Sequence, residues 1–251
     1  MSFDPDGAFR FALRAERDSD EAGAEDAYRR ADGAGHGAAA CNLGLLLFGR
    51  GELEAGEQAL RRADERGDGD GAFNLGVLLA ERGELDEAEA AYRRADERGH
   101  AGGAYNLGLL LEDAGDEDGA EAAFRRADLR GDADGAFNLA ALLHERGDDA
   151  EAEAAARRAE ERGDPDGTLL LGVILQQRDE VAGAEAAYRR AELQGLLAGA
   201  LHLGELLRES GELTGAQAAF RRALRAADDD VAAFAGEALD ELDGPLSVDP
   251  G

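Results

Sequence analysis

The sequence lacks lysine and tryptophan, and it has only one cysteine and four prolines in 251 residues. With Cys41 alone, an intrachain disulfide framework is excluded. Because proline is scarce and the apolar residues are mostly alanine and leucine, we expect a nearly all-helical chain. No window approaches 18 consecutive apolar residues, and the N-terminal MSFDPDGAFRF lacks the basic region and long apolar run of a signal peptide. We therefore expect a cytoplasmic protein without a membrane span.

Positive charge is also in short supply. The 27 basic residues are all arginine and face 56 Asp and Glu residues, which gives a formal net charge of −29 at pH 7. Nucleic acids and anionic membranes are polyanions that such a chain would repel, so neither is an expected partner. The charge instead favours cationic partners. With 44% hydrophobic residues, the chain can still bury a sizeable core.

One unit of 32 residues recurs along almost the whole chain. Its motif Arg-Arg-Ala ends, always at that interval, at Ala31, Ala63, Ala95, Ala127, Ala159, Ala191 and Ala223. A pair of short helices cannot bury its own apolar face, whereas stacked pairs can, which makes a solenoid. We therefore predict an all-α superhelix of seven helix-turn-helix repeats over 6–229, a capping helix at 230–243 and a tail at 244–251. The predicted repeats start at Asp6, Ala38, Asp70, Gly102, Asp134, Asp166 and Ala198.

The third repeat illustrates the predicted helix pair. The run DGDG at its start lacks the remaining ligands of a calcium loop, so we interpret it as a helix cap with Asp70 as the capping residue. Gly83 ends the first helix and Gly99 ends the second. Within the second helix Glu89 precedes Arg93 by four residues, the favourable order of an ion pair that contributes roughly 0.2–0.5 kcal/mol. The same pair recurs at 25/29, 57/61, 121/125, 153/157 and 185/189, and we interpret it as a solvated outer face.

A glycine inside the first helix also recurs, although it costs about 1 kcal/mol relative to alanine. It stands at Gly44, Gly76, Gly108, Gly172 and Gly204. The simplest explanation is a close approach of the partner helix, which a Cβ atom would hinder.

These residues resemble two related families of helical repeats. The run Leu75-Gly76-x-x-Leu79 followed by Gly83, Ala88-x-x-x-Tyr92 and Ala95 resembles the tetratricopeptide repeat. The period is 32 rather than 34, however, and Ala72 and His100 replace the usual Trp and Pro. The junction RRADERGDGDGAFNLG resembles Sel1-like repeats, without their longer turn. The resemblance implies a right-handed superhelix whose first helices line a groove that binds peptides or partner proteins and rarely catalyses a reaction.

No constellation of residues indicates catalysis, a cofactor or a metal. His36 and His100 share one inter-repeat loop position but lie 64 residues apart, and His144 and His202 occupy different positions of first helices. None has the spacing of a zinc site. We interpret Cys41 as a small apolar residue of the core or groove. The expectation is a non-enzyme without cofactor.

An asparagine column is the strongest candidate for a binding site. The residue before the Leu-Gly pair is, in successive repeats, Arg10, Asn42, Asn74, Asn106, Asn138, Leu170, His202 and Phe234. In tetratricopeptide proteins this position faces the groove, and the superhelix of O-linked N-acetylglucosamine transferase is similar, with an asparagine ladder that grips a peptide backbone. An amide can pair with both N–H and C=O of a peptide unit. Asparagines on successive repeats would lie roughly 10 Å apart, so each would face about three residues of an extended peptide.

Other side chains around the column suggest the character of the ligand. Phe73, Tyr105 and Phe137 precede the asparagines, and Leu45, Val77 and Leu109 follow three residues later. The same helices end on Glu81, Glu112, Asp113 and Glu145. An apolar floor with acidic rims favours an extended peptide with apolar and basic side chains. Arg10 and His202 could contact its two ends.

Three alternatives remain open at this point. The asparagines could bond the backbone of a neighbouring repeat and only order the stack, because a solenoid has many helix ends to satisfy. The half-repeat DVAAFAGEALDEL could self-associate through apolar positions that no following helix covers, unless the tail folds back. By analogy alone, some Sel1-like proteins are associated with β-lactam binding or hydrolysis.

Overall fold

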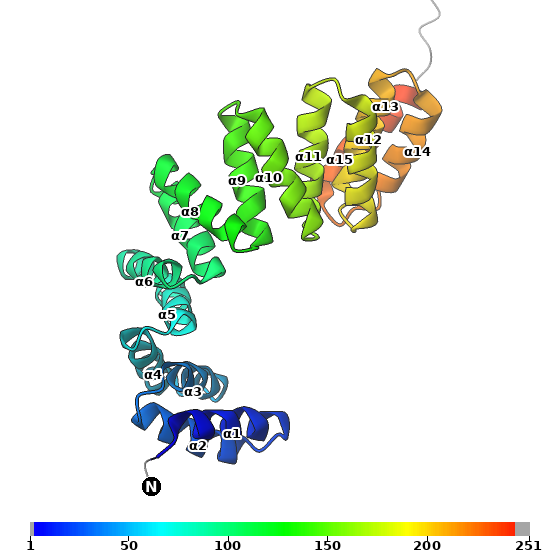
Figure 1. Cartoon of the computed structure of the whole chain (residues 1–251). Coiled ribbons are helices and arrows are strands. Elements are labelled where there is room, and N and C mark those ends of the chain that lie inside the picture. Colours follow the sequence, from blue (N-terminus) through cyan, green and yellow to red (C-terminus); the bar gives the residue numbers. More distant parts are fainter. Residues whose placement is uncertain (1–2, 244–251) are drawn as a thin grey trace, which may run out of the picture. The chain divides into compact units, whose positions relative to one another are not determined.

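The computed structural model describes residues 3–243, so the tail at 244–251 lies outside the described residues. Within that range there are fifteen α-helices and no strand, which confirms the predicted all-α fold (Figure 1). The chain divides into two units, Met1–Asp132 and Ala133–Gly251, and each is described by itself. The first unit contains α1 (Pro5–Arg17), α2 (Glu21–Gly33), α3 (Gly37–Gly49), α4 (Leu53–Glu65), α5 (Gly69–Glu81), α6 (Leu85–Glu97), α7 (Ala101–Asp113) and α8 (Glu117–Leu129). The second contains α9 (Ala133–Glu145), α10 (Asp149–Glu161), α11 (Pro165–Gln177), α12 (Val181–Leu193), α13 (Ala198–Glu209), α14 (Leu213–Ala223) and α15 (Asp229–Asp243).

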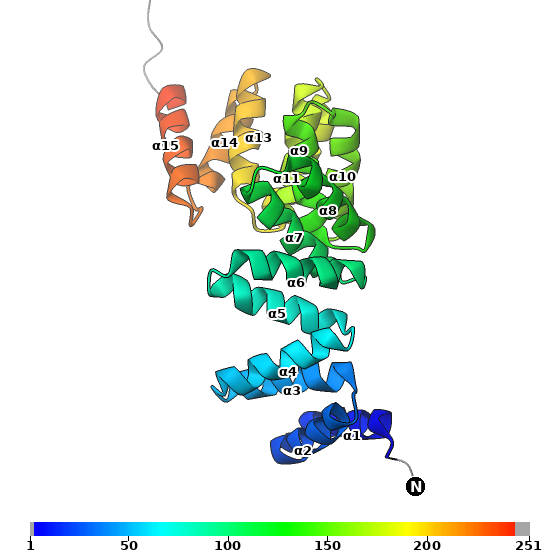
Figure 2. The same ribbon diagram turned by 90° about the vertical axis from the view of Figure 1, so that its left-hand side faces the viewer.

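Each unit is a stack of helix pairs. An odd-numbered helix, called here a first helix, packs along the even-numbered second helix that follows it, and this second helix packs against the next first helix. In the first unit α5 also contacts the first helices α3 and α7. Figures 1 and 2 show the helices α1–α8 stacked in the order of the sequence. This arrangement buries the alanine-rich and leucine-rich faces that a single pair would expose.

The first helices begin at caps that differ from the predicted one. The carboxylate of Asp68, not that of Asp70, accepts the N–H of Gly71 over 2.7 Å and caps α5. Asp70 lies in the first turn, where it is exposed. Asp68 is the capping residue because it is the last residue before α5 with extended backbone (φ −73°, ψ 122°). From that conformation its side chain can reach the free N–H groups of the first turn.

Between the first and second helix of a repeat the chain makes a tight turn with a positive φ angle. Gly83 has φ +77°, and glycine fills this position in most repeats, because a residue without Cβ adopts the left-handed region at no steric cost. Two repeats depart from this rule. Ser19 and Asp179 hold φ angles of +61° and +59° at the same place.

The mid-helix glycines lie where the second helix approaches most closely. A Cβ atom on Gly76 would stand 2.6 Å from a ring carbon of Tyr92, and on Gly108 it would stand 2.5 Å from Phe124. This confirms that the glycine makes room for the partner helix. The fifth repeat reaches the same fit differently, because it has Ala140 in place of glycine and a small Ala156 in place of the ring.

The outer face of the second helices carries the predicted pairs within each helix. Arg93 lies 2.6 Å from Glu89, and Arg125 lies 2.7 Å from Glu121. In five of the Arg-Arg-Ala motifs the second arginine pairs with a carboxylate of the preceding repeat, which the sequence alone did not reveal; these are Arg62, Arg94, Arg126, Arg190 and Arg222. Arg94 holds the buried Asp64 of the preceding repeat with a 3.0 Å and a 2.6 Å hydrogen bond.

These inter-repeat ion pairs form a regular row in the first unit. The buried Asp64 also accepts from Arg98 over 2.6 Å. Burial alone would raise the pKa of Asp64, but the hydrogen bonds and charges of the two arginines outweigh it and hold the pKa below its usual value. The same set recurs as Asp32 with Arg62 and Arg66, and Asp96 with Arg126 and Arg130. In the last repeat Leu224 replaces the acidic residue, and no second helix follows α15 within the described residues.

Across residues 3–243, none of the helices combines the length and the apolar character that crossing a lipid bilayer requires.

Candidate functional site

The asparagine column lies on the first helices, and its members are half-buried. Asn42, Asn74 and Asn106 belong to α3, α5 and α7 of the first unit, whereas Asn138 belongs to α9 of the second. On each helix the next two residues are buried against the core, which leaves the asparagine at the boundary between core and surface.

Asn42 takes part in a hydrogen-bond chain between two repeats. Its Nδ2 donates to the phenolic oxygen of Tyr28 on the preceding second helix over 3.1 Å. The Tyr28 hydroxyl in turn donates to Glu16 over 2.7 Å. Burial, and then the bond to Glu16, raise the pKa of Tyr28, while the bond from Asn42 opposes this change. Asn106 makes the same link to Tyr92, whose pKa burial raises.

Asn74 and Asn138 follow a second helix without tyrosine, and their amides turn elsewhere. Where Tyr28 would stand, the preceding repeats have Leu60 and Phe124, which offer no acceptor. The Nδ2 of Asn74 donates to the carbonyl of Asp70, four residues earlier in its own helix, over 2.7 Å. Asn138 bonds the carbonyl of Asp134 over 2.9 Å in the same way. Asn74 Nδ2 also donates to Cys41 Sγ on α3 over 3.7 Å, so its link to the preceding repeat goes to a thiol in place of a tyrosine hydroxyl. The link to a tyrosine belongs to Asn42 and Asn106 alone among the described contacts of the four asparagines.

Every hydrogen bond described for Asn42, Asn74 and Asn138 uses Nδ2. Within the described part of the chain, none of these bonds uses their Oδ1. The carbonyl oxygen of an asparagine side chain is the group that can accept a hydrogen bond from a backbone N–H.

The aromatic residues beside the column pack between helices. Phe73 stacks on the ring of His100 with centroids 4.3 Å apart and tilts against Tyr92 at 6.1 Å. Tyr105 lies 6.1 Å from Phe124 on the second helix of its repeat. Phe137 is half-buried on α9. All three rings are half-buried, so part of each ring remains accessible to solvent.

The predicted end residues differ in character. Arg10 is exposed on α1, with its guanidinium 3.7 Å from Asp4. His202 on α13 stacks on Tyr188 at 5.4 Å and lies 3.6 Å from Glu205. Burial lowers the pKa of His202, although the charge of Glu205 acts against this change. Leu170 and Phe234 fill the remaining places of the column in the second unit, and Phe234 is 60% exposed.

An open pocket of about 630 Å³ lies beside Asn42 in the first unit. It is lined by Glu16, Ser19, Glu21, Asn42, Leu45, Leu46, Gly49 and Arg50. The pocket thus brings one member of the column together with carboxylates and leucines from the first two repeats. The predicted floor residue Leu45 is 46% exposed there, and Val77 and Leu109 are half-buried further along. The predicted rim residues Glu81, Glu112, Asp113 and Glu145 are exposed.

Two histidines have a structural role that the sequence analysis did not recognise. His36 and His100 cap α3 and α7, since their Nδ1 atoms accept the N–H groups of Ala39 and Gly103 over 3.1 and 3.0 Å. Imidazole is a rare cap, so the usual list of capping residues did not point to them. His144 bonds Asp149 over 3.0 Å and Gln177 over 3.3 Å, away from the column.

Cys41 is buried in the core, as expected, and burial raises its pKa to about 12. Among the described residues, no three His, Cys, Asp or Glu side chains come together in a way that could hold a metal ion. Tyr28 and Tyr92, and Glu16 through Tyr28, are partners of the column that the sequence pattern did not indicate. The available signal was a tyrosine fourteen residues before Asn42 and again before Asn106.

Comparisons with known proteins agree with this architecture. Two tetratricopeptide-repeat family models match residues 41–104 and 101–129. The c5321 protective antigen of uropathogenic Escherichia coli, which displays an SLR fold, superposes with a TM-score of 0.76 at 22% identity. That match covers 98% of this chain and 58% of the antigen chain, so the present chain spans little more than half the length of that relative.

Two further solved structures are similar. A Sel1 repeat protein from Oxalobacter formigenes matches with a TM-score of 0.65 and 23% identity, over 75% of this chain and 86% of that one. YrrB, a TPR protein with an unusual peptide-binding site, matches with a TM-score of 0.56 and 21% identity, over 72% and 99%. No curated protein matches the sequence significantly. Folds of this kind are typically non-catalytic scaffolds for protein–protein interaction. The family models identify tetratricopeptide repeats over residues 41–129, and the solved structures show that the chain has the tetratricopeptide/Sel1-like fold of stacked helix pairs.

Proposed function

We propose that this protein is a non-catalytic scaffold or adaptor that binds an extended peptide segment of a partner protein on the first helices. In the first unit the contact residues are Asn42, Asn74 and Asn106. The observation that carries the proposal is the shared geometry of the amides. They are half-buried at one position of successive first helices, and the described hydrogen bonds of Asn42 and Asn74 use Nδ2 and not Oδ1.

The spacing of the amides suits a peptide backbone. Helices pack roughly 10 Å apart and an extended chain advances about 3.3 Å per residue. Three successive asparagines would therefore span about seven residues of the peptide. The backbone N–H groups of the peptide would meet the Oδ1 atoms. Asn138 presents the same group on the second unit, and Phe73, Tyr105 and Phe137 support the helices that carry the amides.

Charge and apolar exposure narrow the class of ligand. The chain carries a formal charge of −29, and the acidic residues at the ends of the first helices are exposed. Leu45 adds exposed apolar surface beside Asn42. A peptide with alternating apolar and basic side chains fits both features. The similar fold of a TPR protein with a peptide-binding site is in keeping with this proposal.

A displayed library of random decapeptides provides the test. Peptides selected on the wild-type protein are measured against the triple variant Asn42→Ala, Asn74→Ala, Asn106→Ala, with Asn138→Ala as a separate arm. We expect the triple variant to keep its helical circular dichroism and to lose most of the affinity for the selected peptides. Equal binding by a folded triple variant would refute the role of the asparagines.

Self-association through α15 is a second candidate, favoured by the exposure of Phe234 (60%) and Leu224 (44%) in the second unit. Sedimentation velocity over a concentration series distinguishes it from peptide binding. If this candidate holds, the sedimentation coefficient rises with concentration, and Phe234→Ala suppresses the rise. A constant coefficient would eliminate it.

A further inference from the structure

The pocket beside Asn42 combines two carboxylates with an apolar wall. Glu16 comes from the end of α1, and Glu21 from the start of α2. Leu45 and Leu46 come from α3 on the opposite side. The pocket therefore lies between the turn of the first repeat and the first helix of the second repeat.

Its charges are not balanced by the one arginine in its lining. Arg50 makes its short hydrogen bond to Glu25, which lies outside the pocket lining, and its Nη2 is 3.6 Å from Glu21. Glu25 also pairs with Arg29, so the three carboxylates Glu16, Glu21 and Glu25 face two arginines, and one negative charge remains in excess at the pocket. Glu16 accepts one neutral hydrogen bond, from Tyr28, which orients the carboxylate without neutralising it.

The next two repeats lack this combination. At the place of Glu16 they have Phe48 and Ala80, and at the place of Glu21 they have Leu53 and Leu85. Within the first three repeats, the acidic pocket thus marks one end of the asparagine column.

We propose that this pocket receives a cationic side chain, arginine or lysine, of the bound peptide and thereby fixes the register of the peptide over the column. The charged head would pair with Glu16 and Glu21. Its aliphatic stem would cover Leu45, because long basic side chains pack their methylene groups on apolar surface. This inference rests on the proposed peptide binding and adds a position-specific contact to it.

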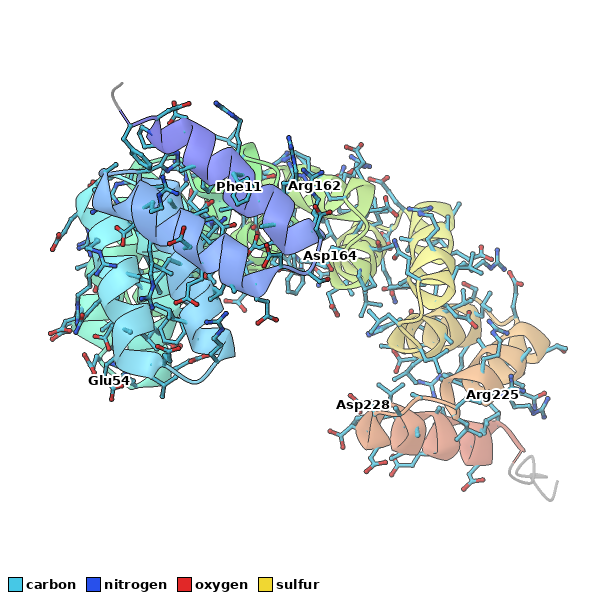
Figure 3. All side chains as sticks on the ribbon, turned by 90° about the horizontal axis from the view of Figure 1, so that it is seen from below. Phe11, Glu54, Arg162, Asp164, Arg225 and Asp228 are labelled. Carbon is cyan, nitrogen blue, oxygen red and sulfur yellow. The ribbon has the colours of Figure 1, made fainter. Side chains whose placement is uncertain are left out.

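The test compares two fluorescein-labelled octapeptides and adds a third. The first alternates leucine with arginine, and the second alternates leucine with citrulline, which keeps the shape of arginine without its charge. The third alternates leucine with lysine and distinguishes the two cations. The protein variant is Glu16→Gln with Glu21→Gln, where the glutamine at 16 still accepts from Tyr28. The matched control is Glu54→Gln with Glu65→Gln on α4, two exposed residues that change the net charge equally. Figure 3 shows Glu54 at the outer edge of the first unit.

We expect the pocket variant to bind the arginine peptide about fivefold more weakly than wild type, as for the loss of a partly exposed ion pair. The control variant should stay within about twofold of wild type, since distant exposed charges are screened by salt. The citrulline peptide should bind both variants equally. A pocket variant that binds the arginine peptide as the control does would overturn the inference.

The two proposals can fail separately. If the alanine variants of Asn42, Asn74 and Asn106 lose binding while the pocket variant does not, the register pocket is wrong and the column stands. If the pocket variant loses binding and the asparagine variants do not, the column is wrong. If wild type binds neither peptide at micromolar concentration, both proposals are refuted. Circular dichroism of each variant confirms that the helices are intact.

Discussion

The amide of Asn42 donates to the hydroxyl of Tyr28, fourteen residues earlier, over 3.1 Å, and so connects the first helix of one repeat to the second helix of the repeat before it. Tyr28 is fully buried, and its hydroxyl contacts both Asn42 and Glu16. The pair thus gives one residue of the predicted binding column a second role in ordering the stack. Asn74 has no tyrosine before it, and its Nδ2 instead meets Cys41 Sγ of the preceding repeat over 3.7 Å.

Removing the hydroxyl should weaken this connection. Tyr28→Phe keeps the buried ring but leaves Asn42 without its acceptor, so we expect a loss of about 1 kcal/mol in the free energy of unfolding. In an Asn42→Ala background the same change should cost clearly less, because the bond is already gone. Urea unfolding followed by circular dichroism measures all four proteins of this cycle. Costs that simply add would show that the hydrogen bond contributes nothing.

The ion pairs between second helices should make the free energy of unfolding fall at acidic pH. Asp64 has a lowered pKa because Arg94 and Arg98 outweigh the effect of its burial. A carboxyl whose folded pKa is depressed contributes stability above its unfolded pKa of 3.8, and that contribution disappears as the pH falls through the folded value.

Asp64→Asn should therefore cost about 2 kcal/mol at pH 7, the usual value of a charge-assisted hydrogen bond. Its difference from wild type should shrink as the pH falls below about 4. Thermal unfolding between pH 2.5 and 7 checks this, with the exposed Glu65→Gln as control. A difference that stays constant with pH would contradict the assignment.

The close approach of Tyr92 to Gly76 should make an added methyl group at position 76 destabilising. Although alanine favours a helix by about 1 kcal/mol, its Cβ would lie 2.6 Å from the Tyr92 ring, and overpacking typically costs 1–3 kcal/mol. We expect Gly76→Ala to lower the midpoint of thermal unfolding. The double variant Gly76→Ala, Tyr92→Ala reproduces the Ala140 and Ala156 pair of the fifth repeat, and the methyl group should no longer be harmful there. If Gly76→Ala stabilises the wild-type background, the close approach does not constrain this helix.

The turn at Asp179 should tolerate glycine well. Its φ angle of +59° lies in the left-handed region, which disfavours side chains with a Cβ atom. Asp179→Gly should therefore raise the free energy of unfolding by about 0.5 kcal/mol, after allowance for the greater freedom of glycine in the unfolded chain. The reverse change at the corresponding turn of the next repeat, Gly211→Asp, should lower it. Differential scanning calorimetry on both variants makes the comparison.

Much of the fold was predictable because its signals are local or strictly periodic. The 32-residue period follows from the recurrence of Arg-Arg-Ala along the chain. The helix-interior Gly76 and the pair of Glu89 with Arg93 depend on spacing that can be read within one repeat. The cap was misassigned by two residues, from Asp68 to Asp70, because DGDG offers two carboxylates and only backbone geometry selects between them.

The candidate site was predictable in position but not in bonding. The sequence placed Asn42, Asn74, Asn106 and Asn138 at one position of the repeat. It did not reveal that Asn42 and Asn106 bond a tyrosine of another repeat while Asn74 bonds its own helix. These partners depend on which side chain stands across the junction between repeats.

The sequence by itself determined a stack of two-helix repeats, because helical periodicity and repetition need no knowledge of contacts between distant residues. Only the tertiary structure decided the partners across repeats, such as Asp64 with Arg94 thirty residues later and His100 with Phe73. The physical reason is that these contacts depend on how successive repeats rotate against each other as they stack. That rotation brings together side chains whose separation in the sequence matches neither the period of a helix nor that of the repeat.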